Sequence, residues 1–189
     1  MQLLVVGATE PEVDWAPPAL RCVCGIGPVD AAVGTAAALA ATRPDAVLHV
    51  GIAGARAASR IPVGAVVIGS RSTYSDLGAA IPVVGFVDAD PRLVALAASV
   101  LAQARIVEIA TSARVGATQG AAVEAMEGFG VLRACARVGV PAVELRVVSN
   151  VVEESDRAKW RVQAALATLR VAARLVFDAV NAQPPLDRG

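Results

Sequence analysis

The sequence predicts an α/β protein whose central sheet is covered by helices on both faces, and three observations support this prediction. Short apolar runs alternate along the chain with stretches of helical pattern. The runs are almost wholly apolar, which is typical of strands that are buried on both sides. The length of 189 residues suits one domain with a full core of its own. We therefore assign residues 1–189 to a single domain, a three-layer α/β/α sandwich.

The N-terminal half repeats a strand, a glycine turn and a helix. Leu3–Val6 is an apolar run before Gly7-Ala8, and Leu20–Cys24 is a second run that ends at a Gly-Ile-Gly turn. Pro28–Thr42 then reads as an alanine-rich helix, and Ala46–Val50 as a third strand that ends in the sequence GIAGA. Ligands of such sheets bind beyond the strand ends, so the residues that follow each strand are the ones to inspect.

The C-terminal half is predicted to hold two further strands and three helices. Asp90 and Pro91 suit the N-cap and the first position of the helix that begins there. Residues 70–90 give no clear pattern, and residues 183–189 are expected to be disordered. The strands are Val63–Ile68 and Ala142–Val148, and the helices are Pro91–Gln103, Val123–Val138 and Asp156–Val180.

Composition restricts the partners of the chain. Apolar residues make up 56% and charged residues 18%, against about 25% charged in an ordinary soluble domain. Such an apolar surplus is best buried against a second copy, so we expect a homodimer or a higher homo-oligomer. The 17 basic and 17 acidic residues balance without a basic block, which argues against nucleic acid as a partner. No apolar run approaches the roughly 20 residues of a membrane span, and the N-terminus lacks a secretory signal, so we expect no membrane partner and a cytoplasmic location.

The cysteines and the histidine carry no clear chemistry. Cys22, Cys24 and Cys135 are odd in number, which favours a reducing compartment over a disulfide framework. Cys22-x-Cys24 matches half of a metal site, but no second Cys/His pair follows, so we expect buried thiols and assign no metal. His49 is the single histidine and lies in the apolar run VLHVG, where a core residue is expected rather than a ligand or a base.

The glycines after the second strand do not complete a nucleotide-binding motif. Gly25-Ile26-Gly27 stands between a strand and a helix, but Asp30 occupies the third position of the GxGxxG pattern. The chain also lacks the GxxxxGK[ST] motif of P-loop NTPases. Two interpretations remain open, namely a close approach of the backbone to a small ligand and a tight turn.

Four segments carry a family pattern. They are VVGATEPEV, GIGPVDAAVGTAAAL, VGIAGA and VEAMEGFGVLRACARVGVPAVELRVVSN. Together they resemble the purine nucleosidase and nucleoside phosphorylase superfamily, over residues 1–76 and 123–165. The resemblance implies a phosphorylase/hydrolase-like α/β/α fold with a mixed central sheet, and a small-molecule nucleoside as the substrate.

Three further details narrow the resemblance. They are the MEG sequence, the ending Ser149-Asn150 where adenosine-type nucleosidases carry Ser-Asp, and the continuation VVEESDRAKW. These details are similar to the futalosine hydrolases, which act in menaquinone biosynthesis. The resemblance implies hydrolysis of the N-ribosidic bond of futalosine and release of hypoxanthine, without a metal or an organic cofactor.

The resemblance also implies roles for the acidic residues. Glu12 is the carboxylate that orients and deprotonates water. Met126 packs on the sugar, and Glu127 accepts hydrogen bonds from the ribose while its charge favours a cationic transition state. Glu124, three residues earlier on the predicted helix, is a candidate second acid. By residue type alone, Glu12 and Glu124 also read as solvated charges and Met126 as a core residue.

The strand at 142–148 and the polar pair after it complete the predicted site. Arg146 is expected to pair with Glu144 on the same strand face, because a lone buried guanidinium is very costly. Ser149, at the end of this strand, matches a position that supports the site in the family that the motifs resemble. Asn150 donates hydrogen bonds to acceptors of the leaving base without transferring a proton, although its residue type also suits a turn or helix cap. The other expected substrate contacts are Ala8, Gly54 and Ser70.

The region from 77 to 122 is shorter than in the relatives that the motifs resemble. In those relatives a loop here brings an aromatic side chain over the base. This chain shows no equivalent, because Phe129 lies on the wrong side of the motif. Relatives also carry a serine where this chain has Gly69, with Ser70 one place later. A weaker activity, an altered substrate and a pocket completed by a neighbouring subunit are all compatible with this pattern.

Three other functions remain open at this point. A nucleosidase for methylthioadenosine and S-adenosylhomocysteine is disfavoured by Asn150. A non-catalytic nucleoside-binding protein would agree with the shortened loop. None of these motifs indicates the group that the substrate carries beyond the ribose, which is a separate question. A phosphorylase would need basic residues for phosphate, with Arg21, Arg43, Arg56 and Arg71 as candidates.

Overall fold

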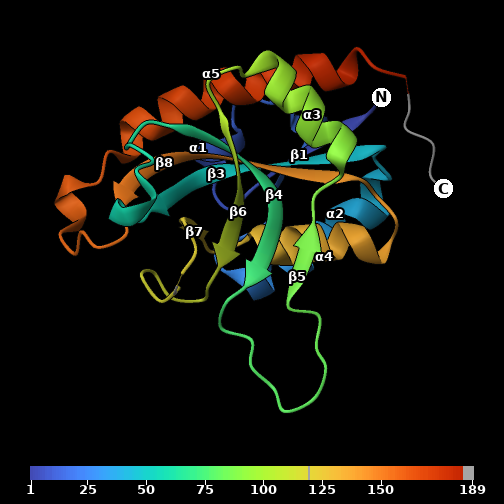
Figure 1. Cartoon of the computed structure of the whole chain (residues 1–189). Coiled ribbons are helices and arrows are strands. Elements are labelled where there is room, and N and C mark those ends of the chain that lie inside the picture. Colours follow the sequence, from blue (N-terminus) through green and yellow to red (C-terminus); the bar gives the residue numbers. More distant parts are fainter. Residues whose placement is uncertain (119, 185–189) are drawn as a thin grey trace.

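The computed structural model describes residues 1–118 and 120–184. Of the tail that is expected to be disordered, residues 185–189 lie outside the described part. The described chain forms one mixed sheet with helices on both sides (Figure 1). This arrangement confirms the predicted α/β class and the mixed central sheet. Within the described ranges, no helix is long and apolar enough to cross a bilayer.

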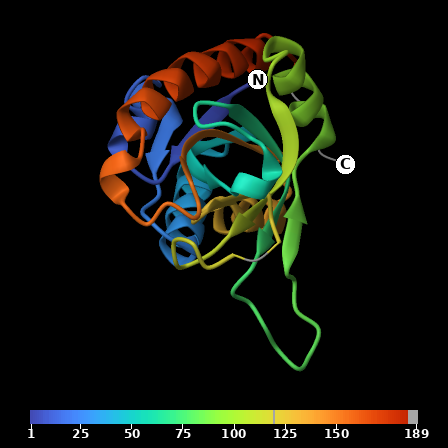
Figure 2. The same cartoon turned by 60° about the vertical axis from the view of Figure 1, so that its left-hand side comes forward.

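The sheet has eight strands among the described residues, and five of them close into a ring. The strands are β1 (Leu3–Gly7), β2 (Arg21–Val23), β3 (Ala46–Ala55), β4 (Val66–Tyr74), β5 (Phe86–Asp88), β6 (Arg105–Thr111), β7 (Val123–Ala125) and β8 (Ala142–Val151). Their order is β2-β1-β3-β7-β6-β4-β5, and β8 pairs with both β3 and β4. β3, β7, β6, β4 and β8 therefore form a closed barrel, which the sequence does not predict. Figure 2 shows the sheet curled on itself under α5 (Val162–Asn181).

The helices lie in two groups. In Figure 1, α3 (Pro91–Val100) and α5 cross one side of the sheet, while α2 (Pro28–Thr42) and α4 (Gly128–Arg137) lie on the other. The remaining α-helix, α1 (Glu10–Val13), is one turn that follows β1. α2 occupies its predicted range, and the Asp90 carboxylate caps α3 by accepting hydrogen bonds from two backbone N–H groups.

The predicted helix at Val123–Val138 is partly wrong. Its first three residues form β7, which pairs with both β3 and β6, and the helix begins only at Gly128. Tertiary pairing overrides local propensity here, because Val123 is needed inside the barrel. Glu124 therefore lies on a strand, and Met126 and Glu127 lie between the strand and the helix.

Three other element predictions need correction. The terminal helix begins at Val162 rather than at Asp156, whose carboxylate instead caps a 3₁₀ turn at Arg157–Lys159. The fourth strand is shifted to Val66–Tyr74. β5 and β6 were not predicted, because their exposed residues hide the pattern of a buried strand.

The apolar core has two parts. The larger part packs the sheet against the helices and includes Leu3, Leu48, Leu145, Leu169 and Val176. The smaller part takes residues from all five ring strands and therefore fills the barrel. Its members are mostly short side chains, which suits the small interior of a five-stranded ring: Ala53, Ala55, Ile61, Val67, Ile109, Val123, Ala125 and Val148.

Candidate active site

A cavity of about 490 Å³ lies where β1, β3, β7 and β8 end. Its position agrees with the rule that ligands of open α/β sheets bind beyond the strand ends. All of the predicted site residues except Ser70 line it, namely Ala8, Glu12, Gly54, Met126, Glu127, Arg146, Ser149 and Asn150. The structure therefore brings together residues from four separate parts of the chain.

Ser70 does not line this cavity. It lies at an irregularity of β4, between Gly69 and Arg71, where the register with β6 shifts. Its carbonyl oxygen accepts a hydrogen bond from Ala89 N at 3.0 Å, which ties this part of β4 to the residue after β5. Ser70 is therefore part of the junction between β4 and β5 rather than of the site.

Glu12 is buried in α1 and turned toward the cavity. Its Oε2 accepts hydrogen bonds from Thr9 N at 2.9 Å and Thr9 Oγ1 at 3.1 Å, and its Oε1 accepts one from Ile52 N at 3.3 Å. A Cβ at Gly51 would lie 2.8 Å from Glu12 Oε1, so glycine at this position leaves room for the carboxylate. These contacts fix the carboxylate, whereas a solvated turn acid would be free to move.

Arg146 joins the residues beneath the cavity. Its Nε donates to Glu144 Oε1 at 2.8 Å, which confirms the predicted pair. Its Nη2 donates to Glu127 Oε2 at 3.3 Å and contacts His49 Nε2 at 2.5 Å. Although burial opposes it, the carboxylates of Glu144 and Glu127 raise the pKa of Arg146, which keeps the guanidinium charged.

His49 is fully buried, as expected for a core residue, and it is neutral. Because a guanidinium can only donate, His49 Nε2 accepts from Arg146, and Nδ1 therefore carries the proton that is donated to Val6 O at 2.9 Å. Burial and the charge of Arg146 hold the pKa of His49 well below its usual value of 6.5. With both ring nitrogens occupied, His49 has no nitrogen left for a substrate.

Glu144 is the deepest acid of this group. Burial raises the pKa of its carboxyl group, and the charge of Arg146 opposes that rise. The carboxylate lies against the first residue of α4, where a Cβ on Gly128 would overlap it. Glu144 therefore has no route to a substrate, and its contacts serve to hold Arg146.

Glu127 links the buried group to the glycine turn after β2. Its Oε1 accepts a hydrogen bond from Gly27 N at 3.2 Å. Gly25 and Gly27 both have φ of 92°, a region that favours glycine, so the Gly-Ile-Gly segment is a tight turn that presents an N–H group to a site carboxylate. Met126 precedes Glu127 and lines the cavity beside it.

Ser149 and Asn150 share the cavity because β8 is irregular at this point. Neighbouring residues on a regular strand face opposite sides, but the register of β8 against β3 shifts between Ala53 and Gly54, and both side chains line the cavity. Asn150 Oδ1 accepts from Ser149 Oγ at 2.8 Å, and Nδ2 donates to Val151 O at 3.1 Å. An amide nitrogen carries two hydrogens, so a second N–H remains for a ligand.

Glu124 lines the cavity edge but is held by the loop after β6. Its Oε1 accepts from Gly116 N at 2.5 Å, and its Oε2 accepts from Thr118 Oγ1 at 2.5 Å and Thr118 N at 3.3 Å. The carboxylate thus organises the loop that carries Val115 to the cavity. These hydrogen bonds account for the burial of Glu124 without any contact between its carboxylate and a substrate.

Most of the apolar lining of the cavity is not predicted from the sequence, and Ala8 and Met126 are the exceptions. This lining includes Trp160, an aromatic side chain that the sequence motif contains without indicating its place. The chain turns back after β8, and Arg161 N donates to Ser149 O at 2.8 Å, which brings Trp160 to the cavity. No local pattern signals this long-range contact. The other apolar residues are Pro11, Ile26, Ile52, Ala53, Val115, Ala125, Val162 and Leu166.

Cationic groups are scarce at the site. Arg146 is the one arginine or lysine among the described residues that line the cavity, and it is already paired. Of the arginines considered for phosphate, Arg21 pairs with Glu10 and Arg71 pairs with Asp88, both away from the cavity. Across the described ranges, no group of three or more His, Cys, Asp or Glu residues is placed to hold a metal ion.

Comparison with known proteins places this arrangement in a family. The model of the phosphorylase superfamily matches residues 15–182. The futalosine hydrolase of Streptomyces coelicolor is 39% identical in an alignment of 190 positions. The alignment covers 87% of this chain and 80% of that protein.

Two solved structures share the fold. The futalosine hydrolase of Helicobacter pylori strain 26695 superposes with a TM-score of 0.83 at 18% identity, over 93% of this chain and 97% of that one. The 5'-methylthioadenosine/S-adenosylhomocysteine nucleosidase of Neisseria meningitidis, in complex with methylthio-immucillin-A, superposes with a TM-score of 0.85 at 19% identity, over 95% of this chain and 100% of that one. At these identities the likeness is one of fold.

Proposed function

Because this chain belongs to the phosphorylase superfamily, and within it to the futalosine hydrolase family, we propose that it hydrolyses the N-ribosidic bond of futalosine and releases hypoxanthine. One observation carries the proposal. Glu12, Glu127 and Asn150, which come from three distant parts of the chain, line a single cavity. They supply the three functions that the reaction needs, namely water activation, ribose binding and stabilisation of the leaving base.

Glu12 and Glu127 act on the water and the sugar. Glu12 takes a proton from water as the water oxygen bonds to the anomeric carbon, and the bond from that carbon to the base breaks. The pair of electrons from that bond leaves with the base. Glu127 accepts hydrogen bonds from the ribose hydroxyls, and its negative charge favours the cationic sugar of the transition state.

Asn150 stabilises the departing base. A 6-oxopurine presents acceptors at O6 and N7, and the free N–H of the Asn150 amide donates to one of them. An amide cannot transfer a proton, so the base leaves as an anion and takes its proton from water afterwards. This suits hypoxanthine, which leaves well as an anion.

The cavity supports hydrolysis better than phosphorolysis. A phosphorylase has to hold a phosphate dianion with cationic groups. The charge of Arg146 is already taken up by Glu144 and Glu127, and nearby Glu12 adds negative charge. A phosphate would therefore meet repulsion, whereas a neutral water molecule meets none.

We further propose that the protein is a homo-oligomer of the cytoplasm. The hairpin at 75–85 projects from the body in both views (Figures 1 and 2), and it exposes Leu77, Ile81, Val83 and Val84. No charged residue lies between Asp76 and Asp88, so a second copy is the fitting cover for this surface. Light scattering of Ile81→Asp should give a smaller mass than the unchanged chain, and equal masses would contradict this role of the hairpin.

The three cysteines are free, which agrees with a reducing compartment.

The reaction is tested by incubating the protein with futalosine, methylthioadenosine and inosine, with and without phosphate. Chromatography then identifies the released base. We expect hypoxanthine from futalosine alone, at a rate that does not depend on phosphate. Release of adenine from methylthioadenosine, or a requirement for phosphate, would assign the chain to another activity of the superfamily. Binding of hypoxanthine without any turnover would indicate a binding protein.

A further inference from the structure

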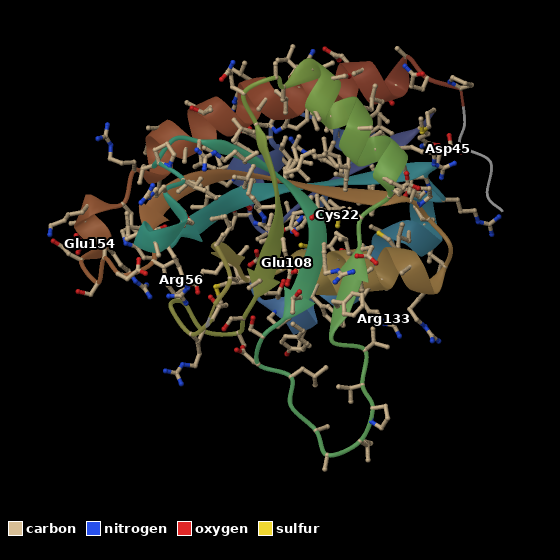
Figure 3. All side chains as sticks on the ribbon, viewed as in Figure 1. Cys22, Asp45, Arg56, Glu108, Arg133 and Glu154 are labelled. Carbon is tan, nitrogen blue, oxygen red and sulfur yellow. The ribbon has the colours of Figure 1, made fainter. Side chains whose placement is uncertain are left out.

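Arg56 lies where three segments of the chain meet at one end of the cavity. It follows β3, and Figure 3 shows its side chain between the loop after β6 and the segment after β8. We propose that Arg56 is a positioning residue, which fixes the end of the cavity that receives the base. The claim that this end of the cavity binds the base rests on the proposed function. The claim that Arg56 holds the three segments together does not.

The side chain of Arg56 contacts both neighbouring segments. Its Nη2 donates to Thr118 Oγ1 at 3.1 Å and lies 4.0 Å from Glu124 Oε2. Its Nη1 lies 3.6 Å from Glu153 Oε1, on the segment after β8. Since Glu124 itself holds Gly116 and Thr118, the guanidinium joins the end of β3 to the second half of the loop at 112–118.

Main-chain hydrogen bonds strengthen the same junction. Arg56 N donates to Ala122 O at 2.9 Å, which ties the end of β3 to the residue before β7. Ala57 N donates to Glu153 Oε2 at 3.1 Å, so the Glu153 carboxylate contacts both a side chain and the backbone next to it. The residue before β7 and the segment after β8 are thereby both hydrogen-bonded to residues 56–57.

Each of the three segments forms part of the cavity wall. β3 contributes Gly54, the loop contributes Val115, and the segment after β8 contributes Trp160. Asn150 Nδ2 lies 3.1 Å from the place that a Cβ on Gly54 would occupy, so the amide packs against the end of β3. The residue that faces the base is therefore held inside the junction that Arg56 organises.

An arginine suits a junction of this kind. Its guanidinium presents N–H groups in several fixed directions, whereas a lysine ammonium acts as a single flexible charge. The Nε of Arg56 is buried and has no acceptor among the described residues, which disfavours this placement. The side chain stays at the junction because its other two nitrogens have partners on both sides.

Hydrogen exchange on the full chain tests the tie without any substrate. In Arg56→Ala, the amides of 112–118 and 152–158 should exchange faster together, by about tenfold, while β1 and β3 keep their rates. Arg71→Ala is the control, since Arg71 is likewise an ion-paired arginine, with Asp88 at 2.7 Å, but lies away from the cavity. Unchanged exchange, or faster exchange in only one segment, overturns the proposal.

Steady-state kinetics and binding test the consequence for the base. In Arg56→Ala, KM for futalosine should rise about tenfold while kcat stays within about twofold, because Arg146 and not Arg56 holds Glu127. Binding of free hypoxanthine should weaken by the same factor, and Arg56→Lys should recover part of the loss. An equal fall of kcat and kcat/KM, together with a lower Tm, indicates a merely structural role and overturns the proposal.

The outcomes separate this proposal from the proposed function. If the unchanged chain releases no base from any nucleoside, the proposed function fails, and the exchange data still decide the role of Arg56. If Arg56→Ala does not fold, Glu153→Gln tests the same tie, because the Glu153 side chain is 49% exposed and outside the core. Faster exchange at 152–158 in that variant supports the tie, and unchanged exchange refutes it.

Discussion

Two arginines organise the acidic residues around one cavity, and they do so in opposite settings. The Arg146 cluster is fully buried beneath the cavity, on strands and at the start of a helix. The Arg56 cluster lies at the rim, with an arginine side chain that is 22% exposed and partners on loops. The first cluster comprises Arg146, Glu127, Glu144 and His49, and the second comprises Arg56, Glu124, Glu153 and Thr118.

We propose that the difference separates chemistry from recognition. Groups of the Arg146 cluster are held by regular elements and are almost completely shielded from solvent, a setting where charges interact strongly and positions are fixed. Groups of the Arg56 cluster are screened by water and connect loops, so they contribute less to stability and more to the shape of the cavity wall. The predictions below test this division from the larger expected effect to the smaller.

The largest effect is expected for the carboxylate beside the Arg146 cluster. Glu12→Gln keeps the size of the side chain but removes the base that activates water, so kcat should fall by about a thousandfold. Rates of hypoxanthine release measure the change. Glu10→Gln is the control on the same helix, since Glu10 is exposed and pairs with Arg21. Release within tenfold of the unchanged rate would contradict the role of Glu12.

Removal of each arginine compares the two clusters directly. Arg146→Ala leaves buried carboxylates unpaired and should lower the free energy of unfolding by about 3–5 kcal/mol. Arg56→Ala should lower it by about 1 kcal/mol or less, because water screens its ion pairs. Urea unfolding of the three proteins gives the values. Similar losses of unfolding free energy in both variants would contradict the distinction between the Arg146 cluster and the Arg56 cluster.

Asn150 follows Arg146 on β8 and precedes Glu153, and its substitution tests how the leaving base is stabilised. Asn150→Asp places acceptor-only oxygens opposite O6 and N7 of the base, so hypoxanthine release should fall by about a hundredfold. The control is Asn181→Asp, at the end of α5 and away from the cavity. Undiminished release in Asn150→Asp would show that the amide does not contact the base.

The smallest effect concerns pH and the single histidine of the buried cluster. The pKa of His49 in the folded state is well below 6.5, so the unfolded chain binds its proton first as the pH falls. His49 should therefore reduce the free energy of unfolding by up to about 1.4 kcal/mol per pH unit below pH 6.5. Urea unfolding between about pH 7.5 and pH 5.5 measures the slope.

His49→Gln should remove that part of the slope, because glutamine does not titrate and this is the single histidine. Glu144 acts with the opposite sign. Its pKa is raised on folding, so its contribution to stability is lost as the pH rises through the folded value. The difference between His49→Gln and the unchanged chain isolates the histidine. An unaltered slope would contradict a neutral buried His49.

Sequence reasoning reached the buried cluster more fully than the rim. Glu144 and Arg146 stand two positions apart, so strand alternation alone predicts that they meet. Arg56 and Thr118 are separated by 62 positions, and only the closure of the barrel brings them together. Patterns within a short window cannot report such contacts.

Misreading of one short strand explains most of the remaining errors. β7 has three residues, which is too short for a periodic signal, so the local pattern predicts the first turn of a helix there. The ring closure, the true position of Glu124 and the order of the cavity wall all depend on that strand. Residues such as Trp160 were missed for a similar reason, because the turn that places them is set by a contact with Ser149.

β7 also couples the two clusters in the folding of the chain. It completes the barrel between β3 and β6, it carries Glu124, and Glu127 follows two residues after its end. If this strand detached, Glu124 would leave Arg56 and Glu127 would leave Arg146 in the same event. The active site should therefore behave as one cooperative unit, in which partial opening disrupts ribose binding by Glu127 and the cavity wall held by Arg56 together rather than leaving one of them intact.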